Sequence, residues 1–123
     1  MRAQSFMENS ILPRVLRPAV DLPDAAETVL SQIAERLRGR VAAAYLFGSL
    51  AEGRATRDSD IDLLLVVETD RPFIERWRDF ADVLQGEYAI DLLVYTPAEF
   101  EHLTANPTAG FWRSFVTCHR RLV

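Results

Sequence analysis

Three aspartates stand in segments whose other residues are mostly apolar. Asp60 directly precedes the run IDLLLVV (61–67), Asp62 is its second residue, and Asp91 lies within AIDLLVY (89–95). Such runs are typical of buried strands, where a carboxylate is costly unless a cation meets it. Side chains alternate between the two faces of a strand, so Asp60 and Asp62 share a face, with about 6.6 Å between their Cα atoms.

If the two strands are neighbours, the three carboxylates converge on one pocket. Such a pocket repels itself unless divalent cations occupy it, and hard oxygen ligands favour Mg²⁺ or Mn²⁺. Two metal ions about 3.5–4 Å apart, bridged by carboxylates, serve phosphoryl and nucleotidyl transfer. We therefore predict Asp60, Asp62 and Asp91 as metal ligands, and interpret Asp58 as a solvated or turn-capping residue.

A Gly-Ser pair, Gly48-Ser49, directly follows the apolar run VAAAYLF (41–47). Glycine lets the backbone come close to a phosphate, and the following N–H groups and the Ser49 hydroxyl can bind its oxygens. Most isolated Gly-Ser pairs are plain turns. Followed by Asp-x-Asp at this distance, the pair indicates a phosphate-binding loop.

These residues resemble the DNA polymerase β-type nucleotidyltransferase superfamily: Gly48-Ser49, then Ser59-Asp60-Ile61-Asp62 opening a hydrophobic strand, then Asp91 in the next strand. The small size and the stretch VYTPAEF (94–100) resemble the minimal nucleotidyltransferase branch of bacteria and archaea. The likeness extends over about residues 24 to 123.

The resemblance implies a Mg²⁺-dependent nucleotidyltransferase that binds ATP. Asp60 and Asp62 would carry the two metal ions, and Gly48 and Ser49 would hold the phosphates. Asp91 would complete the metal site and accept the proton of the incoming hydroxyl. Members of this branch pair with HEPN-domain ribonuclease toxins and act as antitoxins, some by transferring AMP from ATP onto a tyrosine of the partner.

One position departs from the family pattern Gly-Ser-x-Ala-Arg-Gly, because Glu52 stands where the family often has arginine. Arg54 and Arg57 lie close in sequence and are the candidates to supply charge to the triphosphate. The other interpretation is that both are exposed, solvated arginines.

The predicted fold class is α/β, with an α+β-like small mixed sheet flanked by helices. Strands are expected at 41–47, 61–67 and 89–95, and helices at 24–39, 70–86, 96–103 and 111–116. A Thr96–Glu99 capping box begins the helix at 96–103. The helix at 70–86 is expected to bury a stripe of five residues: Phe73, Trp77, Phe80, Ala81 and Leu84. Residues 1–20 read as an N-terminal arm, and 21–123 as one nucleotidyltransferase domain.

Composition excludes several function classes. All 14 basic residues are arginine, so no mechanism that needs a lysine operates here. The net charge of −4 speaks against stable DNA binding, and no apolar run reaches the roughly 18 residues that would span a membrane. The single cysteine, Cys118, excludes an internal disulfide and favours a cytoplasmic location. The charges and prolines of the N-terminus argue against a signal peptide.

Two alternatives to an enzyme that modifies a partner protein stay open. The domain could neutralise a toxin by binding alone, or it could be a small-molecule nucleotidyltransferase of the aminoglycoside-modifying kind. So small a domain cannot enclose its acceptor, so we expect a partner to supply part of the site. Its candidate contacts are the arm and the segment FWRSFV (111–116), which otherwise belongs to the core.

Overall fold

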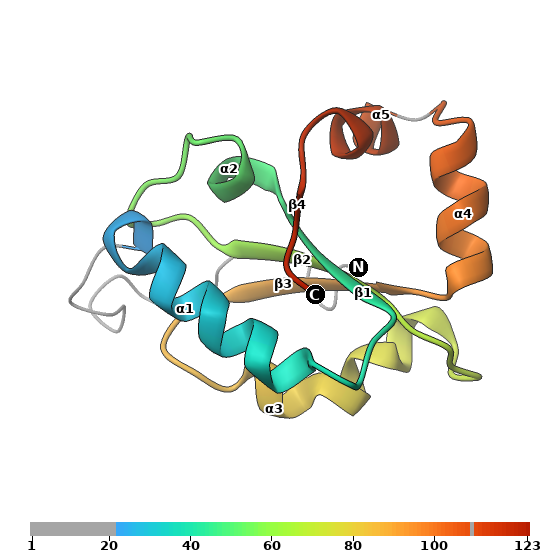
Figure 1. Ribbon diagram of the computed structural model, residues 1–123, viewed down its shortest axis with the longest axis horizontal. Coiled ribbons are helices and arrows are strands. Elements are labelled where there is room, and N and C mark those ends of the chain that lie inside the picture. The colour runs from blue at the N-terminus through green and yellow to red at the C-terminus, as the bar shows by residue number, and fades with distance from the viewer. Residues whose placement is uncertain (1–21, 109) are drawn as a thin grey trace.

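The computed structural model describes residues 22–108 and 110–123 (Figure 1). The predicted arm at 1–20 therefore lies outside the described residues. The elements follow in the order α1 (Leu22–Leu37), β1 (Ala43–Phe47), α2 (Gly48–Ala51), β2 (Ile61–Val66), a 3₁₀ helix η2 (Phe73–Phe80), α3 (Ala81–Leu84), β3 (Ile90–Tyr95), α4 (Pro97–Ala105), α5 (Gly110–Thr117) and β4 (Arg120–Arg121).

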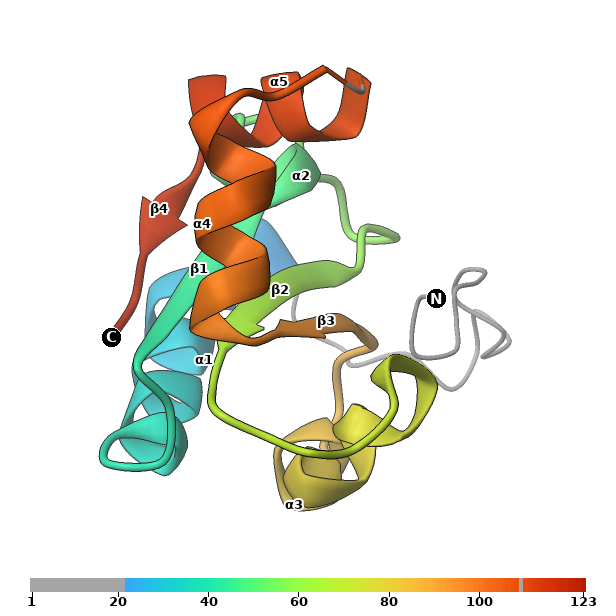
Figure 2. The same ribbon diagram turned by 90° about the vertical axis from the view of Figure 1, so that its right-hand side faces the viewer.

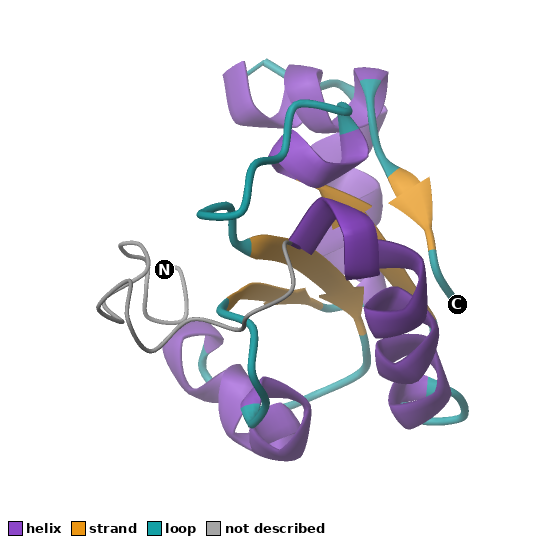
Figure 3. Ribbon diagram, turned by 90° about the vertical axis from the view of Figure 1, so that its left-hand side faces the viewer, coloured by secondary structure: helices purple, strands orange, loops and turns teal. Residues whose placement is uncertain are grey.

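The four strands form one mixed sheet in the order β3-β2-β1-β4. β2 and β3 run parallel, whereas β1 is antiparallel to both β2 and β4. Figure 3 shows β4 at the edge of the sheet, leading to the C-terminus. This arrangement confirms the predicted mixed sheet with flanking helices.

Helices cover both faces of the sheet, α1 and α3 on one side and α4 and α5 on the other (Figures 1 and 2). The alternation along β2 divides its side chains between the two layers. Ile61, Leu63 and Leu65 pack with α1, η2 and α3, while Leu64 and Val66 pack with α5. Every helix of the described ranges is too short or too polar to cross a membrane.

The expected strands are confirmed within two residues at each end, and the Thr96–Glu99 capping box starts α4 as predicted. The first helix begins at Leu22, two residues before the predicted start. Two elements were not predicted: the single turn α2 and the two-residue strand β4, which are too short to carry a hydrophobic period.

The helix expected at 70–86 is mostly a 3₁₀ helix, and its predicted buried stripe is partly wrong. Phe80 is buried as expected, and Arg76 and Val83 are buried although neither was predicted. The other four residues of the stripe are only half-buried: Phe73, Trp77, Ala81 and Leu84. The buried residues Arg76, Phe80 and Val83 are four and three positions apart, so one helical face is buried, and Arg76 lies on it because its partners Val94 and Glu99 lie on that side.

Arg76 joins three elements from this buried position, where it is 7% exposed. Its Nη1 donates to the Val94 carbonyl at 3.1 Å and to Glu99 Oε1 at 2.7 Å, and its Nη2 donates to Glu99 Oε2 at 3.2 Å. These hydrogen bonds hold the pKa of the Glu99 carboxyl below its usual range, against the opposing effect of burial. One side chain thus fixes η2 to the end of β3 and to the first turn of α4.

We expect Arg76→Ala to lower the free energy of unfolding by about 2–4 kcal/mol, because truncation leaves the Val94 carbonyl and Glu99 without this partner. Urea denaturation measures the loss. Arg78→Ala is the matched control, since Arg78 is exposed on the same helix, and should change stability by less than about 0.5 kcal/mol. Equal losses of unfolding free energy in the two variants would show that the hydrogen bonds of Arg76 do not hold these elements together.

Candidate functional site

The strand register sets Asp62 and Asp91 side by side. Asp62 of β2 pairs with Asp91 of the parallel strand β3, and on its other side with Phe47 of the antiparallel strand β1. Adjacent strands lie about 4.8 Å apart, so the two aspartates are immediate neighbours across the sheet. Both residues are half-buried.

These aspartates form the last of three rows on the sheet face that α4 and α5 cover. Read across β1, β2 and β3, the rows are Ala43–Val66–Tyr95, Tyr45–Leu64–Leu93 and Phe47–Asp62–Asp91. The first two rows are packed by aromatic and aliphatic side chains of the helices. The carboxylates therefore lie on the face of the core, at the edge where its apolar packing ends.

Gly48 brings the backbone of the next turn against Asp62. Its φ is +76°, in the left-handed region that favours glycine. A Cβ built on Gly48 would collide with Oδ2 of Asp62 and lie 3.0 Å from its Cγ. Ser49 follows in α2, whose turn is closed by the Glu52 N–H donating to the Gly48 carbonyl at 3.0 Å. The predicted phosphate loop and one predicted metal ligand are therefore in direct contact.

Asp60 ends the loop that leads into β2. The loop is held by Thr56 and Ser59: the Thr56 N–H donates to Ser59 Oγ at 2.9 Å, and the Ser59 N–H donates to the Thr56 carbonyl at 3.0 Å. Asp60 is half-buried, and its Oδ1 is shielded from solvent. Asp58 lies in the turn before it and is also half-buried with a shielded Oδ1, so it is not fully solvated; its interpretation as a turn-capping residue stays a prediction.

The three predicted ligands offer the hard oxygen atoms that Mg²⁺ prefers, and the register joins two of them. As the side chains are placed, however, no group of three or more His, Cys, Asp or Glu residues within 22–108 and 110–123 is arranged to hold a metal ion. The donor chemistry and the strand register of Asp62 and Asp91 fit a metal site. Metal ligation by Asp60, Asp62 and Asp91 stays a prediction.

Residues 28–115, most of the chain, match the sequence profile of a family described as nucleotidyltransferase domain. The chain belongs to the nucleotidyltransferase domain family. No curated protein matches it.

Two solved structures resemble this nucleotidyltransferase domain. One, from Sulfolobus solfataricus, is described as a candidate nucleotidyltransferase; it is 23% identical over 66% of this chain and 72% of its own, with a TM-score of 0.47. The other is described as a toxin–antitoxin with AMP-PNP; it is 22% identical over 79% of this chain and 72% of its own, also with a TM-score of 0.47.

Arg54, one of the two predicted triphosphate ligands of this nucleotidyltransferase domain, is engaged by Glu52. Its Nε and Nη2 donate to Glu52 Oε1 at 2.8 and 2.6 Å. Glu52 thus stands where the family pattern has arginine. It also forms an ion pair with Arg54, the nearest arginine that could supply the missing positive charge. Arg57 is exposed on the same loop. The placement of phosphates at Gly48 and Ser49, and of charge at Arg54 and Arg57, stays a prediction.

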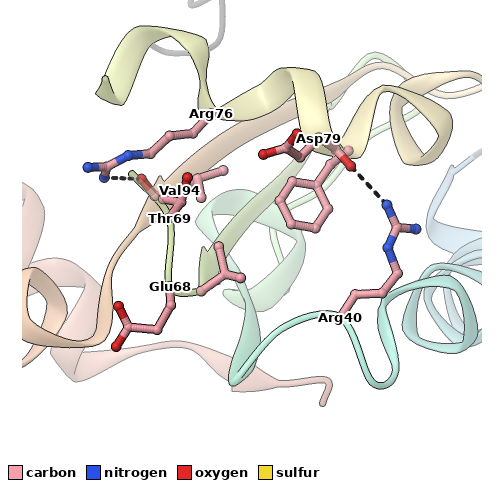
Figure 4. A pocket seen from close by; sticks show the side chains of 8 residues that line it. Arg40, Glu68, Thr69, Arg76, Asp79 and Val94 are labelled. Atoms are coloured by element: carbon pink, nitrogen blue, oxygen red, sulfur yellow. Dashed lines mark hydrogen bonds between the residues drawn. The ribbon is translucent and has the colours of Figure 1, made fainter. Parts of the chain in front are cut away.

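A separate pocket of 220 Å³ lies beyond the opposite ends of β2 and β3 (Figure 4). Its arginines already have partners in the protein. Arg40 donates to both carboxylate oxygens of Asp82 at 2.9 and 3.0 Å and to the Asp79 carbonyl at 2.9 Å, and Arg76 binds Val94 and Glu99. The hydrogen bonds from Arg40 lower the pKa of the Asp82 carboxyl. We interpret this pocket as part of the scaffold, joining α1 to η2 and α3.

Gly48 and Gly53 provide a matched test of the contact with Asp62. Their φ angles are +76° and +75°, but an added Cβ meets nothing within 4 Å at Gly53. Gly53→Ala should cost about 1 kcal/mol of unfolding free energy, for backbone strain alone. Gly48→Ala should cost about 2 kcal/mol more, because the methyl group must displace the Asp62 carboxylate.

Urea denaturation of both alanine variants measures this difference. If the two substitutions prove equally costly, Asp62 does not pack against Gly48.

Proposed function

We propose that this domain transfers AMP from ATP, in the presence of Mg²⁺, onto a hydroxyl group of a partner protein. The observation that carries the proposal is the contact of Gly48 with Asp62, together with the pairing of Asp62 with Asp91. A close backbone approach suits a phosphate, and adjacent carboxylates suit hard cations on that phosphate. Membership of the nucleotidyltransferase domain family supports the same reaction class.

Each residue has a distinct task in this reaction. Gly48 and Ser49 would bind the phosphates, and Asp60, Asp62 and Asp91 would hold two Mg²⁺ ions, which would neutralise charge on the phosphates. The acceptor oxygen attacks the α-phosphorus in line, the bond to the bridging oxygen breaks, and pyrophosphate leaves. Asp91, at the outer strand of the carboxylate row, takes the proton of the attacking hydroxyl.

The acceptor is proposed to be a tyrosine of a HEPN-type ribonuclease toxin, so that the domain acts as its antitoxin in the cytoplasm. This follows the resemblance of residues 94–100 and the small size of the domain, which leaves the acceptor to a partner. A hetero-oligomer is the expected working form. The arm and the segment 111–116 stay the candidate contacts.

Two observations favour the alternative of neutralisation by binding alone. The carboxylates are not arranged as a three-ligand metal site in the described residues, and Glu52 pairs with Arg54. If both features persist when ATP and Mg²⁺ are added, catalysis would be weak and the toxin would be neutralised by contact.

A label-transfer experiment distinguishes the enzyme from the protein that neutralises its partner by binding alone. The purified domain is mixed with Mg²⁺, ATP labelled at the α-phosphate and a lysate in which its genomic neighbour is co-expressed. We expect a labelled protein band, reduced at least about 100-fold in rate by Asp60→Asn and by Asp62→Asn, because each removes a carboxylate proposed to hold the Mg²⁺ ions that neutralise charge on the phosphates. Asp70→Asn, at an exposed carboxylate beyond the other end of β2, is the control and should label normally.

Label in RNA or in a small molecule would keep the chemistry and change the acceptor. A stable complex without label would reject the enzyme and favour the binding protein.

The pairing of Glu52 with Arg54 makes a second prediction. Glu52→Gln should release Arg54 for the triphosphate and tighten ATP binding about 2- to 5-fold, the scale of an exposed ion pair. Calorimetric titration with ATP and Mg²⁺ measures the change. The double variant Glu52→Gln/Arg54→Ala should lose the gain. A gain that persists in the double variant would show that Arg54 is not the group released.

A further inference from the structure

α5 presents a partly exposed phenyl ring beside the carboxylate row. Phe111, in the first turn of the helix, is 39% exposed, whereas Trp112 and Phe115 of the same helix are 8% and 3% exposed. Phe111 and Phe115 lie one turn apart, so Phe111 belongs to the inward side of α5. Its exposure arises because it reaches past the edge of the packed core.

Neighbouring rings fix the orientation of Phe111. Its ring lies 5.4 Å from that of Phe47 at 89°, 5.0 Å from Trp112 at 86°, and 6.3 Å from Phe115 at 24°. Aromatic pairs at these distances favour edge-to-face and offset geometries. The ring is therefore held in place before any ligand binds, which lowers the entropy lost when a ligand stacks on it.

The contact with Phe47 connects this ring to the proposed nucleotide site. Phe47 is the last residue of β1, directly before Gly48, and it is the register partner of Asp62. Phe111 consequently lies over the strand next to Asp62, on the face that carries the carboxylates. In Figure 2 α5 lies beside α2, the turn that begins at Gly48, and the Cys118 thiol just after α5 donates to the Ala51 carbonyl of α2 at 3.6 Å.

We propose that Phe111 is a stacking platform for the nucleobase of the bound triphosphate; this inference rests on the proposed function. A nucleotide has an apolar ring system joined covalently to its phosphates. With the phosphates at Gly48 and Ser49, the rim formed by Phe47 and Phe111 is the aromatic surface next to them. Stacking on an aromatic side chain suits every base, because every base has a π-face. A phenyl ring carries no hydrogen-bonding group, so this contact adds affinity without choosing between adenine and guanine.

Calorimetric titrations with two ligands, each with Mg²⁺, test the platform: ATP and inorganic tripolyphosphate, which lacks the base. Phe111→Leu removes the π-face and keeps an apolar side chain of similar size. We expect it to weaken ATP binding about 10-fold and to leave tripolyphosphate binding within about 2-fold. Phe111→Tyr should restore ATP binding. Ile74→Ala is the control and should leave both titrations unchanged, since Ile74 is an apolar side chain exposed at 69% on η2, outside the proposed site.

Unchanged ATP binding by Phe111→Leu would overturn the platform. Loss of acceptor labelling with unchanged ATP binding would overturn it too, and would assign the ring to the acceptor. Equal weakening of both ligands would show a general disturbance of the site and also reject the platform. Wild-type protein that binds neither ligand would instead refute the proposed function, and this inference with it.

Discussion

The approach of the Asp62 carboxylate to the backbone of Gly48 sets the arrangement of this end of the domain. A side chain at residue 48 would occupy the space of that carboxylate, and the left-handed backbone there suits glycine. β1 can therefore end at Phe47 and turn at once into α2. Without a Cβ at this position, the loop proposed for phosphate and the carboxylate proposed for metal come into contact.

The opposite end of the sheet is held by a different kind of interaction. Arg76 hydrogen-bonds the Val94 carbonyl and the Glu99 carboxylate, which is also part of the capping box that starts α4. The direction in which α4 leaves β3 is thereby fixed at its first turn. α4 leads into α5, whose aromatic side chains pack on the same face as Asp62. The aromatic rim of the proposed site thus depends on the ion pair of buried Arg76 with the half-exposed Glu99 at the far end of β3.

Strands and the shared face of Asp62 and Asp91 could be predicted because both depend on local pattern. Apolar runs identify strands, and an aspartate within such a run indicates a position where the core meets a polar site. The 3₁₀ helix η2 could not be predicted in this way, because Arg76 is buried through partners 18 and 23 residues away. The engagement of Arg54 by Glu52 was missed for a different reason: two nearby charges fit either an ion pair or two solvated side chains.

The carboxylates also help to specify the sheet that positions them. A shift of one residue between β1 and β2 would turn Asp62 toward the face that packs against α1 and α3, where Leu63 and Leu65 are fully buried. A shift of two residues would keep Asp62 on the same face of the sheet but align it with Tyr45, in the next row, which the helices cover. Either shift moves a charge into apolar packing, which is costly without a cation. The observed register leaves the charges at the edge of the core, so the residues proposed for catalysis also select the pairing that brings them together.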